Sequence, residues 1–158
     1  MKISIKNFIK TAKFGPIEIG ISKEKAIQVL GKPDSDNNLG ETGSILLYGW
    51  YELFFNHENT LHSIQNDKYN PNASETYEFK NEVFKIDSWF LNHRKNQTID
   101  EISKLLYSSD IDHSVINYYG RNVIITSSNV VIDFSDDENE LGVRELIGIR
   151  YWPNEVYT

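Results

Sequence analysis

Residues 16–67 and 96–151 carry the same order of hydrophobic and polar positions. Each stretch begins with a polar residue that can cap a helix, continues with one short amphipathic helix, and then leads through a polar segment into two or three strands. Each stretch ends in a matching pair of strand-like segments, residues 52–59 with 61–64 in the first and residues 131–139 with 146–149 in the second. The pattern predicts a duplicated unit made of a helix and an antiparallel hairpin.

Local start and stop signals place the two helices. The first helix is predicted over residues 23–30, because Ser22 can cap its start and Gly31 supplies a left-handed stop. The second helix is predicted over residues 99–107, where Thr98 and a glutamate three positions later form a capping box.

Period-two alternation and aromatic or branched side chains place the strands. Strands are predicted at residues 3–9, 45–49, 51–56, 60–66, 114–118, 121–126, 129–135 and 144–152, and residues 77–92 begin with strand character. The composition of residues 34–44 and 136–143 is typical of loops, and residues 67–76 are predicted to link the two units.

These elements predict an α+β fold in which two tandem helix-plus-antiparallel-hairpin units share one curved antiparallel sheet, with the helices on one face. The first unit would cover residues 1–70 and the second residues 71–158. A chain of 158 residues is long enough for both units to bury one continuous core, so we expect one compact domain.

Strand alternation divides the side chains between the two faces of the predicted sheet. Leu53, Phe55, Val130, Ile132, Phe134, Ile147 and Ile149 are expected to face the helices, whereas Glu52, Phe54, Val131, Asp133, Ser135, Leu146, Gly148, Arg150 and Trp152 are expected on the helix-free face. Aromatic side chains beside an acid and a base are typical of a protein-binding surface. The candidate partner-binding residues are Tyr48, Trp50, Phe54, Asp133, Arg150 and Trp152. In the alternative reading, terminal segments cover this face.

Composition and charge narrow the range of partners. The net charge is −7, and residues 77–158 hold 8 basic and 14 acidic side chains against 8 and 9 in residues 1–76. An acidic field disfavours nucleic acid and anionic lipid and would speed encounter with a basic protein. Acidity that serves solubility alone is the competing explanation. The 20 aromatic residues (8 Phe, 9 Tyr and 3 Trp) fit either a binding surface or a strand-rich core.

The sequence contains no recognisable catalytic or metal-binding motif. It has no cysteine, and its four histidines, His57, His62, His93 and His113, are scattered. The acidic run that starts at Asp136 lacks the glycine and the final carboxylate of a calcium-binding loop. We therefore expect no enzyme activity, no metal and no cofactor. The N-terminal segment lacks the apolar run of a signal peptide, which indicates a cytoplasmic protein.

The segment Ile19–Pro33, IGISKEKAIQVLGKP, followed by a strand pair, resembles the opening of the superfamily that joins small outer-membrane assembly lipoproteins to the β-lactamase inhibitor protein. The inhibitor carries two such modules in tandem at about this total length. The resemblance implies helical units packed on one side of a continuous antiparallel sheet, with the opposite concave face gripping another protein. It weakens in the second unit, where Tyr107–Asp110 (YSSD) replaces the Gly-x-Pro stop.

A small acidic chain with this resemblance, without cysteine or a signal peptide, is similar to bacterial immunity proteins. We expect a cytoplasmic immunity-type inhibitor, monomeric in isolation, that binds and neutralises a cognate protein toxin or enzyme through the exposed sheet face. Two alternatives stay open. One is a self-associating structural or accessory module of a larger assembly, and the other is a small hydrolase whose carboxylates come from distant segments.

Overall fold

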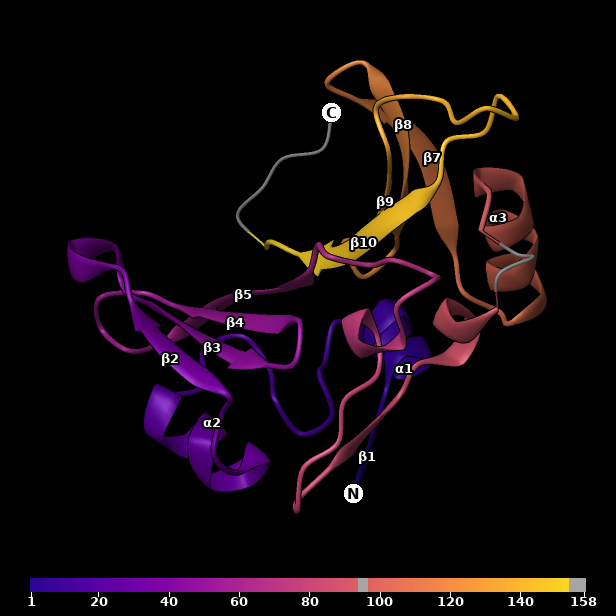
Figure 1. Ribbon diagram of the computed structural model, residues 1–158. Helices are drawn as coiled ribbons and strands as arrows, with labels where there is room; N and C mark the ends of the chain where they lie inside the picture. Colours follow the sequence, from indigo (N-terminus) through magenta and orange to yellow (C-terminus); the bar gives the residue numbers. More distant parts are fainter. Residues whose placement is uncertain (94–96, 154–158) are drawn as a thin grey trace.

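A computed structural model describes residues 1–93 and 97–153 and shows an α+β fold (Figure 1). Within these residues, eight strands form one antiparallel sheet in the order β2-β3-β4-β5-β10-β9-β8-β7, and β1 and β6 form a small parallel sheet. The strands are β1 (Lys2–Ser4), β2 (Ser35–Asn38), β3 (Ser44–Tyr48), β4 (Tyr51–Phe55), β5 (Leu61–Asn66), β6 (Lys85–Asp87), β7 (His113–Tyr118), β8 (Arg121–Thr126), β9 (Val130–Phe134) and β10 (Leu146–Tyr151).

Three α-helices occur in the described chain, α1 (Ile5–Thr11), α2 (Lys23–Leu30) and α3 (Ile99–Ser108). Three short 3₁₀ helices accompany them, η1 (Gly40–Thr42), η2 (Ser74–Thr76) and η3 (Trp89–Asn92). Both predicted N-caps are present: the Ser22 hydroxyl accepts the backbone N–H of Lys25, and the Thr98 hydroxyl accepts that of Glu101. The predicted capping box is formed on one side only, since Glu101 Oε2 is buried without a hydrogen-bond partner in the described chain. Gly31, with φ at 82°, ends α2 as predicted.

The expectation of a strand over residues 3–9 is wrong beyond Ser4. The Ser4 hydroxyl accepts the backbone N–H of Asn7 at 3.0 Å and thereby caps α1. Ile5, Phe8 and Ile9 are buried at helical spacing, so the helical period prevails over the alternation of the first residues.

The predicted loop over residues 34–44 instead contains the edge strand β2. Ser35–Asn38 pairs antiparallel with β3 although asparagine and aspartate disfavour strands. The main-chain hydrogen bonds to β3 outweigh this weak local preference, and the polar side chains suit an edge. The predicted linker, residues 67–76, is also ordered, because Tyr69 lies in the core and Asn66 donates a hydrogen bond to the Thr76 carbonyl.

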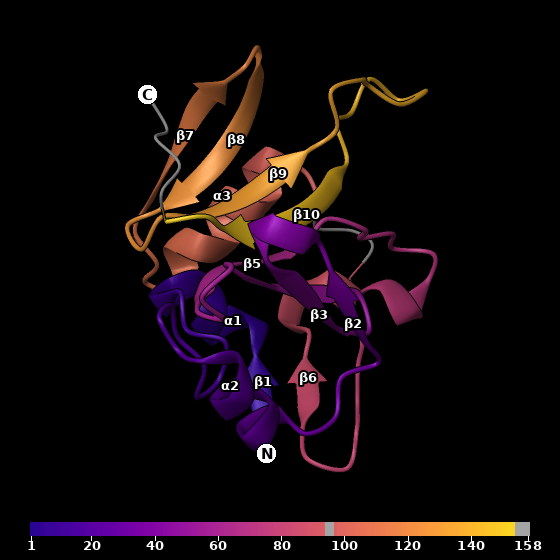
Figure 2. The ribbon, with the colours of Figure 1, turned by 90° about the vertical axis from the view of Figure 1, so that its left-hand side faces the viewer.

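The helices cover one face of the sheet, and its two halves curve away from them (Figures 1 and 2). One cluster of buried side chains combines residues of both halves, including Phe8 and Leu30 from the helices, Leu53 and Phe55 from β4, and Ile132 from β9. The order of elements is α2 before β2–β5 and α3 before β7–β10, and β5 pairs with β10 at the centre of the sheet. The last strand of each half therefore forms the junction.

Candidate functional site

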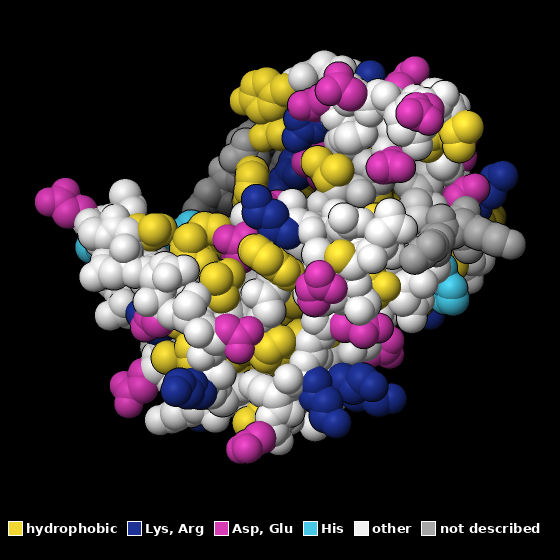
Figure 3. All heavy atoms as spheres, viewed as in Figure 1, with side chains coloured by type: hydrophobic (Ala, Val, Ile, Leu, Met, Phe, Trp, Pro, Cys, Tyr) yellow, Lys and Arg dark blue, Asp and Glu magenta, His cyan; other side chains and the backbone are white. Residues whose placement is uncertain are grey.

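The large sheet has one face that points away from the helices, the open face. The strand register assigns to it Ile45, Leu47, Glu52, Phe54, Ser63, Gln65, Ile116, Tyr118, Arg121, Val123, Ile125, Val131, Asp133 and Arg150. The surface is hollowed between the two halves of the sheet, and hydrophobic side chains gather along the hollow (Figure 3). A curved sheet face of this kind can accept a convex partner.

Polar side chains cross the junction of the two halves. Glu52 on β4, Gln65 on β5 and Arg150 on β10 are neighbours in register. The Gln65 amide donates a weak 3.4 Å hydrogen bond to Glu52 Oε1 and accepts one at 3.0 Å from the indole N–H of Trp152. Trp152, two residues after Arg150, is thus fixed over the open face.

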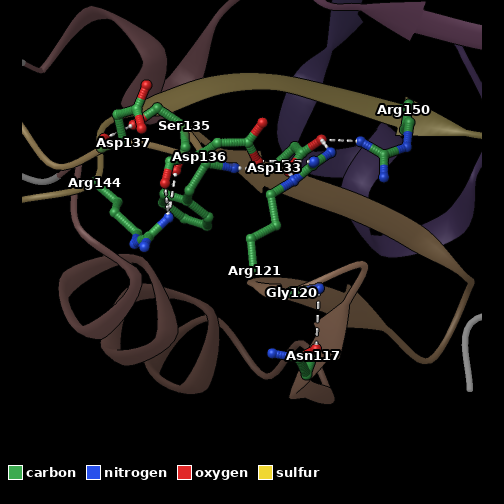
Figure 4. A network of polar contacts seen from close by, with 10 residues as sticks. Asn117, Gly120, Arg121, Asp133, Ser135, Asp136, Asp137, Arg144 and Arg150 are labelled. Carbon is green, nitrogen blue, oxygen red and sulfur yellow. Dashed lines mark hydrogen bonds and ion pairs between the residues drawn. The ribbon is translucent and has the colours of Figure 1, made fainter.

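Asp133 lies between two arginines (Figure 4). Arg121 donates two hydrogen bonds to its carboxylate, both at 2.9 Å, and Arg150 Nη1 donates another to Asp133 Oδ2. Burial would raise the pKa of Asp133, but the hydrogen bond from Arg121 and the charge of Arg150 outweigh it and hold that pKa below its ordinary value. The hydrogen bond to Asp133 in turn raises the pKa of Arg121. The Asp133 carboxylate thus lies in an ion-pair network with both arginines, and Asp136, 3.0 Å from Arg121 Nη1, adds a second carboxylate to it.

Arg150 is buried but incompletely paired. Only 9% of its side chain is exposed, and its guanidinium lies 4.6 Å from the Trp152 ring and 5.6 Å from the Tyr118 ring. Such contacts stabilise a cation over an aromatic face. Nε and Nη2 are both closed off from solvent and have no hydrogen-bond partner within the described chain. A buried unpaired donor costs roughly 1–3 kcal/mol, more for a charged group, so this arrangement is unfavourable in the isolated protein.

Glu52 carries the second unusual charge of the open face. Burial raises the pKa of its carboxyl to about 7, and a hydrogen bond with Asp67 adds to the effect, against smaller lowering contributions from Gln65 and Lys68. A carboxyl with this pKa exchanges its proton near neutral pH. The junction therefore holds a group whose charge depends on pH beside a fixed cation.

Apolar side chains flank the polar row on both sides. On β7 to β9, Tyr118, Val123 and Val131 form a small cluster of their own, separate from the main core. On β3 and β4, Ile45, Leu47 and Phe54 are half-buried, and the Phe54 ring lies 6.1 Å from that of His62. Half-buried apolar side chains therefore lie on both halves of the open face, since Ile116 and Ile125 pack on the β7–β9 cluster.

The structure brings three of the six predicted site residues together: Asp133, Arg150 and Trp152. Phe54 lies on the open face as predicted, two strands away from β10. Trp50 is 41% exposed in the turn between β3 and β4. Tyr48 corrects the expectation of a surface position, because it is fully buried on the helix side, where its hydroxyl donates to the Gly31 carbonyl.

The expected register of the last strand is also wrong at its start. Leu146 was expected on the open face but is buried in the main core, and Ile147 was expected inside but is 36% exposed. A β-bulge between Leu146 and Gly148 shifts the alternation by one residue, so the register is right again from Ile149 onward.

Sequence reasoning missed Arg121, Tyr118 and Gln65. Each lies on a strand whose position was predicted, but the face of these strands was not assigned. Pairing Ile125 with Val131 in the hairpin of β8 and β9 would have placed Arg121 on the face of Asp133, since both alternations share one register.

One cleft lies away from the open face, beside β1 and β6. It has a volume of about 570 Å³, and lysines from β1, β6 and the preceding loop line it, with Glu78 and Asp87 at the same site. Among residues 1–93 and 97–153, no group of three or more histidine, cysteine or carboxylate side chains is arranged to hold a metal ion.

The chain matches no family model, no curated protein and no solved structure. Its resemblance to the inhibitor superfamily, which is carried by Ile19–Pro33, therefore stays a prediction. Every helix within the described ranges falls short of the length and apolar character that a membrane crossing needs.

Proposed function

We propose that this protein is an immunity-type inhibitor that binds a cognate protein toxin or enzyme on its open face. The observation that carries the proposal is the composition of that face. Half-buried apolar side chains on β3 and β4 lie beside a charged row in which Asp133 pairs with two arginines. Protein interfaces are typically built from apolar and aromatic anchors next to arginine.

The proposal includes a tandem origin of the scaffold. The order of one helix followed by four strands occurs twice, and the final strands of the two halves pair with each other. Two copies of one unit, joined through their last strands, would give this topology and would place both open faces on one continuous surface. A rigid surface of this type lowers the cost of ordering the binding side chains.

Affinity would come from a few anchors, and charge would fix the orientation of the partner. Phe54 and Trp152 are the proposed aromatic anchors, since both are half-buried and lie on opposite sides of the junction. Acidic side chains at the rim, such as the exposed Asp136, would speed encounter with a basic partner.

The test has two steps. First, the tagged protein is used to capture a stoichiometric partner from its native host or from cells that express the adjacent reading frame. Second, the activity of the purified partner is titrated with the protein. We expect activity to fall linearly to an end point at one equivalent. A partner whose activity is unchanged at saturation would contradict inhibition while leaving binding intact.

Self-association is the competing function, and one observation favours it. The strand β7 lies at the edge of the large sheet, and its Val115 is 47% exposed. An unpaired edge with an exposed apolar residue can pair with a second copy of the chain. Light scattering after size-exclusion chromatography separates the two functions, because the inhibitor proposal expects a monomer and the edge-pairing proposal a dimer that Val115→Lys dissolves.

A further inference from the structure

The open face contains Arg150, whose unpaired hydrogen-bond donors indicate which acceptor a partner would supply. Arg150 donates through Nη1 to Asp133, and its guanidinium carbon lies 5.6 Å from the centre of the Tyr118 ring and 4.6 Å from that of the Trp152 ring. Its Nε and Nη2 form one edge of the planar group and have no acceptor among the residues that the structure describes. The two unpaired donors therefore lie on a single edge of the Arg150 guanidinium.

An edge with two parallel N–H donors matches one chemical group particularly well. A carboxylate accepts both hydrogen bonds at once, with one oxygen for each donor, and its charge strengthens them. Asp133 cannot pair this edge, because Arg121 already donates two hydrogen bonds of 2.9 Å to its carboxylate and Arg150 reaches it through Nη1 only. Arg150 is thus the arginine of the row whose hydrogen bonding is incomplete.

We infer that Arg150 is a subsite for a carboxylate of the partner, from an aspartate or glutamate side chain that enters the open face at the β5–β10 junction. The inference rests on the proposed function of that face. Nε and Nη2 of Arg150 are closed off from solvent in the isolated protein, so the carboxylate can reach them only if a covering side chain is displaced. The inference requires the Trp152 ring to move, since it lies 4.6 Å from the guanidinium, follows the last strand and makes a single side-chain hydrogen bond, to Gln65.

The subsite can be tested without the partner. The probe is N-acetylglutamate amide, which carries one carboxylate, and the control is N-acetylglutamine amide, which is equal in shape and uncharged. Nitrogen-15 NMR of the arginine Nε–H groups follows Arg150, and Arg121 and Arg144 serve as internal controls because both already donate to acceptors. We expect a saturable shift of Arg150 alone, with half-saturation on the order of 1–10 mM, and a parallel change in Trp152 fluorescence.

Two outcomes overturn the inference: an Arg150 signal that does not move at concentrations roughly tenfold above that range, or equal shifts of Arg121, Arg144 and Arg150. Once a partner is captured, Arg150→Lys gives the second arm, because lysine keeps the charge beside Asp133 but lacks the two-donor edge. We expect affinity to fall roughly 10- to 100-fold, with Arg144→Lys unchanged as the control. Undiminished affinity in Arg150→Lys would also overturn it.

The two proposals fail in different ways. If no partner is captured or inhibited, the proposed function fails, and the Arg150 signal still reports on the subsite. If a partner binds but neither the probe nor Arg150→Lys has an effect, the function stands and the carboxylate subsite fails. Should Arg150→Lys not fold, the NMR measurement on the unaltered protein decides.

Discussion

Gln65 on β5 and Arg150 on β10 lie directly opposite each other, and this pair joins the two halves of the open face. Gln65 accepts a hydrogen bond from Trp152, whose ring lies against Arg150, so the pair also fixes the aromatic cover of the cation. The structural junction of the sheet and the proposed binding surface therefore depend on the same side chains.

Asp133→Asn should be strongly destabilising. The substitution removes the negative charge that balances Arg121 and Arg150, and it leaves a buried cation without its counter-charge. We expect a loss of about 3 kcal/mol in the free energy of unfolding, measured by urea titration. Asp136→Asn is the matched control, since that side chain is 73% exposed and pairs with Arg121 alone; its loss should stay below about 0.5 kcal/mol. Equal losses in both variants would contradict the buried network.

Glu52 should make stability depend on pH near neutrality. Its pKa rises from 4.5 to about 7 on folding, so the folded state holds the proton more tightly than the unfolded state. This contribution is complete below about pH 4.5 and is lost as the pH rises through about 7. Because Glu52 is half-buried, solvent screening reduces the effect, and we expect a decline of about 1–2 kcal/mol between pH 5 and 8.

Glu52→Gln isolates this effect because glutamine resembles the protonated acid and does not titrate. Urea unfolding midpoints at several pH values should be flat from pH 5 to 8 in the variant and should decline in the unaltered protein. The lowered pKa of Asp133 makes stability fall as the pH falls, and it does so at lower pH, so it does not change the slope between pH 5 and 8. The account of Glu52 fails if both proteins show the same slope.

Tyr48→Phe should affect stability and leave binding intact. The substitution removes the 2.8 Å hydrogen bond from the Tyr48 hydroxyl to the Gly31 carbonyl at the end of α2. We expect a loss of about 1 kcal/mol by urea unfolding and an unchanged affinity for the partner by calorimetry. A clear loss of affinity with normal stability would contradict this account and indicate that Tyr48 contacts the partner.

Gly148→Ala should disrupt the junction of the two halves. A Cβ at this position would lie 2.3 Å from the Asn66 carbonyl oxygen and 2.9 Å from the Asp67 Cα, and neither backbone atom can move cheaply. We expect a loss of more than about 2 kcal/mol in the free energy of unfolding. At Gly40, where φ is +74° and an added Cβ meets no atom within 4 Å, alanine should cost only about 1 kcal/mol. Similar costs at the two glycines would contradict the close contact between β5 and β10.

The parts of the fold that local chemistry determines were predictable from the sequence. The helix over residues 23–30 and the start of the second helix depend on Ser22, Gly31 and Thr98, whose effects reach only a few positions. The edge strand β2 was missed because Ser35–Asn38 has loop composition and forms a strand only through pairing with β3. Long-range pairing of this kind leaves no local signal.

The candidate site was predictable only as far as local strand alternation determines it. Alternation alone placed Phe54, Asp133 and Arg150 on one face. It could not reveal that Asp133 binds Arg121, because that contact depends on the register between β8 and β9. The bulge between Leu146 and Gly148 was not predicted either, because strict alternation along residues 144–152 contains no register shift.

The central claim is that the open face binds the partner, and calorimetric titration of the purified partner tests it most directly. Phe54→Ala and Trp152→Ala are compared with Tyr107→Ala, which removes an 82% exposed aromatic side chain from α3 on the helix side of the sheet. With unfolding midpoints close to that of the unaltered protein, the first two variants should each lose roughly 30-fold or more in affinity, and Tyr107→Ala should lose none. Full affinity in Phe54→Ala and Trp152→Ala, or a loss in Tyr107→Ala alone, would contradict binding at the open face.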